Sequence, residues 1–273
     1  MTITESIIIA IVEGITEFIP ISSTGHMIIV TKLLGIPENE FTKLFTIAIQ
    51  LGAILSVIVL YYKRFFLPEN GWNKQWQFYF KLAAGVIPAL IFGFLFNDKI
   101  DALLESTLTI AISLLVGGII LLFIDSLFNN SEKVDDATKI SYKQAIIVGV
   151  WQCIAMIPGV SRSAASIIGG MQQKLSRSAA AEFSFFLAVP TMLAATGYKL
   201  FKHYKTTGGF TSEEIKLLAI GNLVAFIVAI FAIKFFISLL KKHGFKIWGI
   251  YRIIVGIILL IMIYTGYINN GPQ

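Results

Sequence analysis

The sequence predicts an all-α integral membrane protein made of two inverted-topology repeats, each a re-entrant helical hairpin followed by three transmembrane helices. The 273-residue chain is 56% hydrophobic and only 14% charged, with a mean hydropathy of +0.79, whereas soluble domains carry about a quarter charged residues. Four apolar runs approach the roughly 20 residues that a spanning helix needs, and two shorter runs, 82–96 and 183–198, can be extended by neighbouring interfacial residues. The second half of the chain also repeats landmarks of the first, which indicates an internal duplication.

The first repeat is predicted over residues 1–128. Its hairpin, about 7–34, consists of two short apolar runs separated by a polar break at Pro20. The first run, 7–19, would cover only about 20 Å as a helix, which is too short to cross a hydrocarbon core of about 30 Å. An irregular break at membrane depth persists only where protein or a wet cavity surrounds it. Transmembrane helices are expected at about 44–62, 81–97 and 107–127.

A polar linker, 129–141, separates this repeat from the second, 142–273. The second hairpin, about 145–175, breaks at Pro158 as the first breaks at Pro20. Three further transmembrane helices are expected, at about 182–200, 216–238 and 247–267. Three is an odd number, so the second repeat enters the membrane from the opposite side, and the repeats are inverted as in many transporters.

Lysine and arginine gather on the side of this topology opposite the N-terminus. The group includes Lys63, Arg64, Lys74, Lys81, Lys143, Lys241, Lys242 and Lys246. The positive-inside rule therefore places that side in the cytoplasm and both termini outside. No basic stripe with interleaved aromatic residues appears, so we expect no nucleic-acid partner. The single cysteine, Cys153, excludes an internal disulfide.

Glu13 and Glu17 are four residues apart, so they share one face of the first short helix. Placing an ionisable group in a bilayer costs about 3 kcal/mol or more, and two on one face call for a reason. They are candidates for a proton acceptor, for a metal site, or for support of a neighbouring histidine or arginine. The alternative is a pair of carboxylates that a wet rim merely tolerates.

Each hairpin break is followed by residues that suit a helix N-terminus. Ser22 stands at an N-cap position, and Ser23, Thr24, Gly25 and His26 follow it. In the second hairpin the corresponding residues are Gly159, Ser161, Arg162 and Ser163. Helix N-termini bind phosphate, and arginine matches phosphate oxygens in bidentate fashion. If the inverted repeats bring both breaks together, they form one anion site; the alternative is that these small residues serve close helix packing.

His26 lies three residues after Ser23, which is suitable spacing for a serine–histidine nucleophile pair on one helix face. A core histidine bonded to a carbonyl is the alternative. Among the other polar residues, Gln50 and Asn222 lie within apolar runs; packing is the favoured interpretation for both, and a hydrogen bond between helices is the alternative. Trp151, Gln152, Glu182 and Ser184 border the second hairpin and are candidates to line its cavity.

These residues resemble the undecaprenyl-diphosphate phosphatases, also called bacitracin-resistance proteins. The resemblance covers essentially the whole chain and is most specific in Glu13-Gly-Ile-Thr-Glu-Phe-Ile-Pro-Ile-Ser-Ser-Thr-Gly-His26 and in Pro158-Gly-Val-Ser-Arg-Ser163. It implies removal of the terminal phosphate from a C55 isoprenoid diphosphate, which returns the monophosphate carrier lipid to cell-wall synthesis and confers bacitracin resistance. It also implies a homodimer in the bacterial inner membrane with an outward-facing site, and stimulation by Mg²⁺ or Ca²⁺ without an organic cofactor.

The resemblance further implies roles for individual residues. Glu13 and Glu17 match the acidic pair of the family, Ser23 its proposed nucleophile, His26 its essential histidine and Arg162 its essential arginine. In the preferred scheme Ser23 attacks the terminal phosphorus with His26 as base, while Glu17, with Glu13, orients His26 or binds the metal. His26 or water as nucleophile are the rival schemes. A lipid or anion transporter, or flippase, that uses the same inverted-repeat site is the alternative function.

Overall fold

The computed structural model describes residues 1–37, 39–67, 71–96, 103, 106–128 and 134–268, and all named elements within these ranges are helical. The α-helices are α1 (Ile3–Thr16), α2 (Ser23–Leu33), α3 (Glu40–Ala48), α4 (Gln50–Leu60), α5 (Tyr62–Phe66), α6 (Trp72–Leu95), α8 (Thr107–Leu127), α9 (Tyr142–Cys153), α10 (Arg162–Gln172), α11 (Arg177–Thr207), α12 (Ser212–His243) and α13 (Lys246–Tyr264). Two short 3₁₀ helices are η1 (Ala137–Lys139) and η2 (Ile154–Met156). Part of the predicted linker, 129–133, lies outside the described residues.

Six helical stretches within the described residues are long and apolar enough to cross a membrane. They are Glu40–Leu60, which combines α3 and α4, and the helices α6, α8, α11, α12 and α13. This confirms the prediction of an all-α, multi-pass membrane protein. Two spans are longer than predicted. The helices α11 and α12 extend at both ends beyond the predicted transmembrane helices 182–200 and 216–238, into segments that also contain polar and charged residues.

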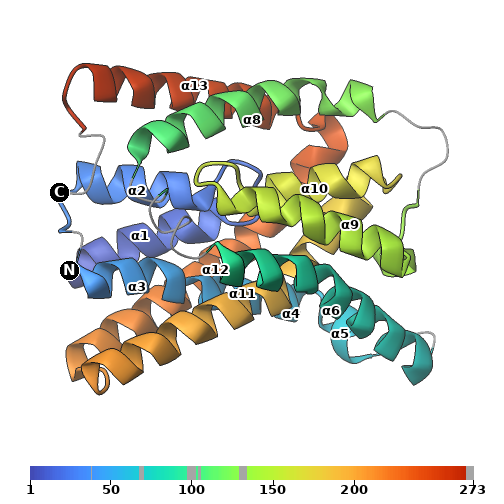
Figure 1. Cartoon of the computed structure of the whole chain (residues 1–273), viewed down its shortest axis with the longest axis horizontal. Coiled ribbons are helices and arrows are strands. Elements are labelled where there is room, and N and C mark those ends of the chain that lie inside the picture. Colours follow the sequence, from blue (N-terminus) through green and yellow to red (C-terminus); the bar gives the residue numbers. More distant parts are fainter. Residues whose placement is uncertain (38, 68–70, 97–102, 104–105, 129–133, 269–273) are drawn as a thin grey trace.

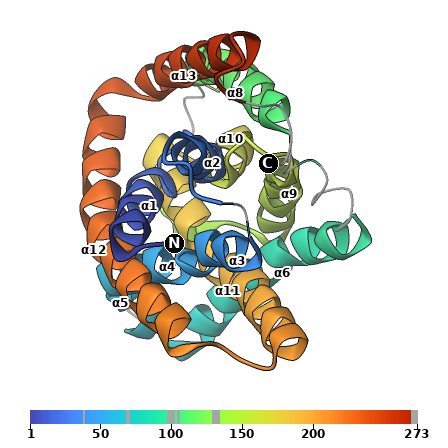
Figure 2. The same ribbon diagram turned by 90° about the vertical axis from the view of Figure 1, so that its left-hand side faces the viewer.

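The short hairpin helices lie inside the bundle and the long helices lie around them. In an end-on view, α1, α2 and α10 occupy the middle, while α12, α13, α8 and α6 form much of the periphery (Figure 2). The helix α8 packs along α13, α1 packs along α12, and α6 packs along α9. The N-terminus and the C-terminal end of α13 lie at one end of the molecule, and α5 lies at the other (Figure 1). The first helix of each hairpin therefore packs on a long helix from the opposite half of the chain.

The two hairpins share their local construction. The helices α1 and α9 each begin with a capping box, formed by Thr2 with Glu5 and by Ser141 with Gln144. The helices α2 and α10 each begin after a serine N-cap, Ser22 or Ser161, as predicted. Both serines have a positive φ, 74° and 76°, a backbone conformation that is uncommon for residues other than glycine. Such conformations persist where the surroundings enforce them and are often found at functional sites.

The first spanning stretch is interrupted between α3 and α4, where a continuous helix over 44–62 was predicted. The side chain of Asn222 on α12 explains the interruption, because its Oδ1 accepts a 2.7 Å hydrogen bond from the main-chain N–H of Gly52. A Cβ atom at Gly52 would lie only 2.1 Å from the carbonyl oxygen of Asn222, so glycine permits this close approach. Asn222 thus forms a hydrogen bond between helices, which was the alternative to the favoured packing role.

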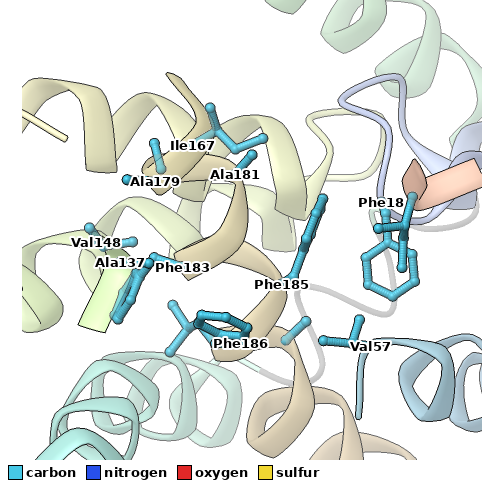
Figure 3. Packing of buried hydrophobic residues seen from close by; sticks show 14 of the residues in the cluster. Phe18, Val57, Ala137, Val148, Ile167, Ala179, Ala181, Phe183, Phe185 and Phe186 are labelled. Carbon is cyan, nitrogen blue, oxygen red and sulfur yellow. The ribbon is translucent and has the colours of Figure 1, made fainter. Parts of the chain in front are cut away.

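Phenylalanine side chains from α11 fill the largest hydrophobic cluster (Figure 3). Phe186 meets Tyr61, Phe65 and Phe78 edge to face, with ring centroids 5.1–5.5 Å apart. Phe185 meets Phe18 in the same geometry at 5.3 Å. Edge-to-face pairs contribute about 0.5–1.5 kcal/mol each beyond their burial. Through Phe18, this cluster holds the break of the first hairpin against α11.

Candidate active site

The carboxylate of Glu17 joins the two hairpins. Glu17 follows the last residue of α1 and is only 6% exposed. Its Oε2 accepts a 2.5 Å hydrogen bond from Ser23 Oγ, and its Oε1 forms a 2.9 Å ion pair with Arg162 Nη2. Ser23 is the first residue of α2 and Arg162 the first residue of α10. The hydroxyl and the guanidinium that were predicted to share a site therefore lie on the two oxygens of one carboxylate.

The guanidinium of Arg162 is also held from α11. Its Nη1 donates to the main-chain carbonyl of Ser184 at 2.9 Å and to the Ser184 hydroxyl at 3.3 Å. The Ser184 hydroxyl in turn lies 2.7 Å from that of Ser166, and Arg162 Cζ lies 5.9 Å from the centre of the Phe18 ring. Arg162 Nε is buried and has no hydrogen-bond partner among the described residues. Besides its ion pair with Glu17, Arg162 is thus held by neutral groups on α11, and its Nε donor has no partner among the described residues.

Glu13 lies one helical turn before Glu17 and is completely buried. Neither of its carboxyl oxygens has a hydrogen-bond partner within the described part of the chain. The Glu13 carboxyl group interacts electrostatically with the Glu17 carboxylate and with the Arg162 guanidinium. A buried carboxyl without a partner is costly unless it is protonated or binds a cation. The predicted pairing of the two glutamates is therefore present in space.

His26 has other partners than Ser23. Its Nδ1 lies 2.7 Å from the main-chain carbonyl of Ser22, and its Nε2 lies 2.8 Å from the hydroxyl of Tyr251, whose ring stacks on the imidazole at 5.6 Å. A carbonyl oxygen only accepts hydrogen bonds, so Nδ1 carries the proton. The neutral ring then accepts from Tyr251 at Nε2. The Ser23 hydroxyl donates to Glu17 instead, so this geometry favours Glu17 over His26 as the acceptor of its proton.

Most of the hydroxyl groups predicted to bind substrate have structural partners in this conformation. Ser22 Oγ accepts from Gly25 N and Ser161 Oγ accepts from Ala164 N, each at 3.3 Å. Ser163 Oγ donates to the carbonyl of Ile19 at 3.1 Å and lies 3.0 Å from Ser161 Oγ. Ser163 therefore ties the second break directly to the first. Thr24 is partly exposed beside Ser23.

Gly159 fits only as glycine. Its φ is 88°, and a Cβ atom there would lie 2.7 Å from the carbonyl oxygen of Ile110 on α8. Both the left-handed conformation and the close approach exclude a side chain. The second break is therefore pressed against α8.

Arg252 on α13 holds both hairpin breaks in place at once, a role that was not predicted from the sequence. It is fully buried. Its Nη1 donates to the carbonyls of Pro20 and Val160 at 3.1 and 2.9 Å, and its Nη2 donates to those of Gly159 and Ser113 at 2.8 and 3.0 Å. A lone Tyr251-Arg252 pair within an apolar run was the only signal in the sequence. Arg252 contacts both hairpin breaks, and Tyr251 contacts His26 on α2.

The described residues contain no group of three or more histidine, cysteine, aspartate or glutamate side chains that would enclose a metal ion. Glu13 and Glu17 are nevertheless adjacent, and the Glu13 oxygens have no other partner. Mg²⁺ is typically held by one or two carboxylates together with substrate phosphates. The donor set therefore fits a divalent cation that is shared with a bound phosphate.

Comparison with known proteins identifies the family of this chain. Residues 6–258 match the family model described as bacitracin resistance protein BacA. A protein of Flavobacterium johnsoniae named undecaprenyl-diphosphatase is 58% identical over 262 residues, covering 96% of each chain. Proteins of the same name from Porphyromonas gingivalis and Aquifex aeolicus are 50% and 44% identical, covering 97% and 94% of this chain and 98% and 97% of their own. With both hairpin motifs inside the matched region, the chain belongs to the bacitracin resistance protein BacA family.

Proposed function

We propose that the chain hydrolyses undecaprenyl diphosphate to undecaprenyl phosphate and inorganic phosphate. The relatives described above carry the name undecaprenyl-diphosphatase. The observation that carries the proposal for this chain is the single carboxylate, Glu17, that joins the Ser23 hydroxyl to the Arg162 guanidinium. A nucleophile, a proton acceptor and a phosphate-binding cation thus lie in contact.

Arg162 and the two helix N-termini would bind the diphosphate. The first N–H groups of a helix have no acceptor within the helix, and those of α2 and α10 begin at Ser23 and Arg162. Together with the guanidinium they supply positive potential for the phosphate oxygens. In this conformation a Glu17 oxygen occupies Arg162 Nη2, so a phosphate oxygen would replace or share that contact.

Ser23 is the proposed nucleophile and Glu17 its base. The Ser23 hydroxyl already donates its proton toward Glu17 Oε2, so Glu17 accepts that proton as Oγ bonds to the terminal phosphorus. The bond from this phosphorus to the bridging oxygen breaks, and the lipid monophosphate leaves with its electron pair. Water then hydrolyses the phosphoserine and releases inorganic phosphate. Arg162 stabilises the charge on the transferring phosphoryl group, which is the main catalytic task in this chemistry.

His26 contributes from one side of this path. Its ring is held by Ser22 and Tyr251 and lies on the same helix as Ser23, one turn later. In this scheme His26 positions the first turn of α2 through its contacts with Ser22 and Tyr251. The rival schemes make His26 or water the nucleophile.

Glu13 and Glu17 would hold Mg²⁺ or Ca²⁺ together with the phosphate oxygens. A divalent cation there neutralises charge on the diphosphate. Among the described residues, the buried Glu13 carboxyl has no hydrogen-bond partner, so we assign Glu13 to holding the cation or a proton rather than to contact with the lipid.

The proposed setting is the bacterial inner membrane, where the chain forms a homodimer with the site and both termini facing outside. The product is reused as carrier lipid for the cell wall, and resistance to bacitracin is a consequence. The inverted repeat is part of this proposal. It is supported by the matched serine caps with positive φ and by the packing of α1 on α12 and of α9 on α6. The concentration of lysine and arginine at the end that carries α5 supports the orientation.

Trapping the covalent intermediate tests the scheme. Purified protein in detergent is mixed with undecaprenyl diphosphate, quenched with a denaturant at neutral pH, where both phosphoserine and phosphohistidine persist, and analysed by peptide mass spectrometry. We expect a phosphoryl group on Ser23, and none in Ser23→Ala. Phosphate on His26 would replace Ser23 as nucleophile, and full phosphate release by Ser23→Ala would exclude the covalent serine path.

A transporter is the second candidate, because two broken hairpins with facing helix N-termini also suit anion passage. Detergent micelles distinguish the two functions, since hydrolysis needs no second compartment. Phosphate release in micelles supports the enzyme. Its absence, together with movement of the lipid between the leaflets of reconstituted vesicles, would support transport.

A further inference from the structure

A cavity of about 490 Å³ lies at the end of the molecule opposite the N-terminus. It is formed by α5, the first half of α6 and the segment around η1. None of the candidate active-site residues lines it. Its volume falls within the range of small-molecule sites, about 300–1,000 Å³. The cavity is therefore large enough for a ligand and separate from the proposed chemistry.

The lining is strongly positive. Five cationic side chains face the cavity: Lys63, Arg64, Lys74, Lys81 and Lys139. Among the described residues, the lining contains one carboxylate, that of Asp136. A second carboxylate, Glu182, interacts with Arg64 but does not line the cavity. Like charges gathered around one cavity repel one another, so an anion between them would be favoured.

Asp136 is already engaged by neighbouring groups. Its Oδ1 accepts hydrogen bonds from the N–H and the hydroxyl of Thr138, at 2.9 and 2.8 Å. Burial disfavours its charged form, but these hydrogen bonds and the positive charges of Arg64 and Lys139 hold the pKa of Asp136 below its ordinary value. Within the described part of the lining, one ionised carboxylate stands against five cations, which leaves an excess of positive charge there.

Hydrogen bonds between the surrounding elements fix the shape of the cavity. Gln75 Nε2 donates to the carbonyls of Arg64 and Phe65, at 2.8 and 3.2 Å, and the Tyr79 hydroxyl also donates to the Phe65 carbonyl. Lys81 Nζ donates to the Thr138 carbonyl at 3.3 Å, which ties α6 to η1. The basic side chains therefore project from a cross-linked concave surface, unlike lysines scattered over an exposed helix.

The position of α6 places this cavity at the level of lipid headgroups. Trp72, Trp76 and Phe80 follow one another at four-residue spacing and are 59%, 55% and 61% exposed. Exposed tryptophans near the end of a spanning helix are typical of the membrane–water interface. The cavity lies on the other side of the same turns, where Lys74, Phe78 and Lys81 point.

From these observations we infer that the cavity between α5, α6 and η1 binds a phosphate-bearing anion. Lysine binds phosphate as a point charge, and basic pockets between spanning helices bind the headgroups of anionic lipids. At headgroup level the nearest source is an anionic phospholipid; a soluble phosphate has the same chemistry. Because the lining joins α5 and α6 to a segment within the predicted linker, 129–141, the bound anion stabilises the contact between the first half of the chain and this linker. This inference is independent of the proposed phosphatase activity.

The test compares two triple variants of the full chain in detergent. Lys63→Gln with Lys74→Gln and Lys81→Gln removes three charges from the cavity. The matched control, Lys143→Gln with Lys242→Gln and Lys246→Gln, removes three exposed charges from the same end of the molecule but outside the cavity. The thermal unfolding midpoint is recorded with added inorganic phosphate, with short-chain phosphatidylglycerol, and with short-chain phosphatidylcholine.

We expect phosphatidylglycerol to raise the midpoint of the unmodified protein and of the control by several degrees, and to leave the cavity variant unchanged. A rise with inorganic phosphate that follows the same pattern would identify a soluble anion as the ligand. Equal shifts in the cavity variant and the control, no shift with either anion, or the same shift with phosphatidylcholine would overturn the inference. If the triple variant does not fold, Lys63→Gln with Lys74→Gln gives the same comparison with the Lys81 hydrogen bond intact.

Discussion

Arg252 Nη2 donates a 2.8 Å hydrogen bond to the main-chain carbonyl of Gly159, 93 residues away in the sequence. The same guanidinium reaches Pro20 in the other hairpin. One buried side chain on α13 thus holds both helix breaks in the register that brings Arg162 to Glu17. The candidate site depends on this contact as much as on the residues that would touch the substrate.

Replacing Arg252 by lysine keeps the charge but not the planar set of donors, so the carbonyls of both breaks cannot all be satisfied. We expect a loss of about 3 kcal/mol or more in stability and a large loss of phosphate release. Thermal unfolding in detergent and a phosphate assay measure the two effects. The control is Lys246→Met at the exposed start of α13, for which we expect a change within about 0.5 kcal/mol. If Arg252→Lys unfolds at the wild-type midpoint and releases phosphate at the wild-type rate, Arg252 does not hold the two breaks in register.

Replacing Glu17 by glutamine keeps the size of the side chain but removes the carboxylate that accepts the proton of Ser23. We expect kcat for phosphate release to fall by about 100-fold or more in a protein that still folds. Glu213→Gln, on the exposed first turn of α12, is the matched control and should retain the full rate. An unchanged kcat in Glu17→Gln would return the role of base to His26.

Gly159→Ala adds both backbone strain and a collision with Ile110. Gly208 separates the two effects, because its φ is 79° but nothing lies within 4 Å of an added Cβ. We expect Gly208→Ala to cost about 1 kcal/mol, the usual penalty for a left-handed alanine, and Gly159→Ala to cost more and to reduce phosphate release. Chemical denaturation compares the two stabilities. Equal costs would mean that the second break is not pressed against α8.

The sequence was sufficient for features that depend on local signals. Six apolar runs predicted the six long helices, and Pro20 and Pro158, each followed by a serine cap, predicted the two breaks. The proximity of Ser23 and Arg162 also followed from the assumed symmetry of the repeats. Each of these inferences uses spacing within one segment or a match between two segments.

Contacts between distant segments were not predictable in the same way. The interruption of the first span depends on Asn222 reaching Gly52, and the register of the breaks depends on Arg252. Helical spacing suggested a Ser23–His26 pair, but the turn before α2 aims the Ser23 hydroxyl back toward Glu17, while Tyr251 holds the imidazole. A single sequence carries no direct signal for such pairings.

Phosphate release from undecaprenyl diphosphate in micelles by purified Arg162→Ala tests the central claim most directly. Arg177→Ala is the matched control, because Arg177 begins α11 and pairs with Asp125 outside the candidate site. Loss of the cation that stabilises the transferring phosphoryl group predicts a decrease of at least about 100-fold in Arg162→Ala, with a folded protein and a nearly unchanged rate in the control. Full activity in folded Arg162→Ala would contradict the account.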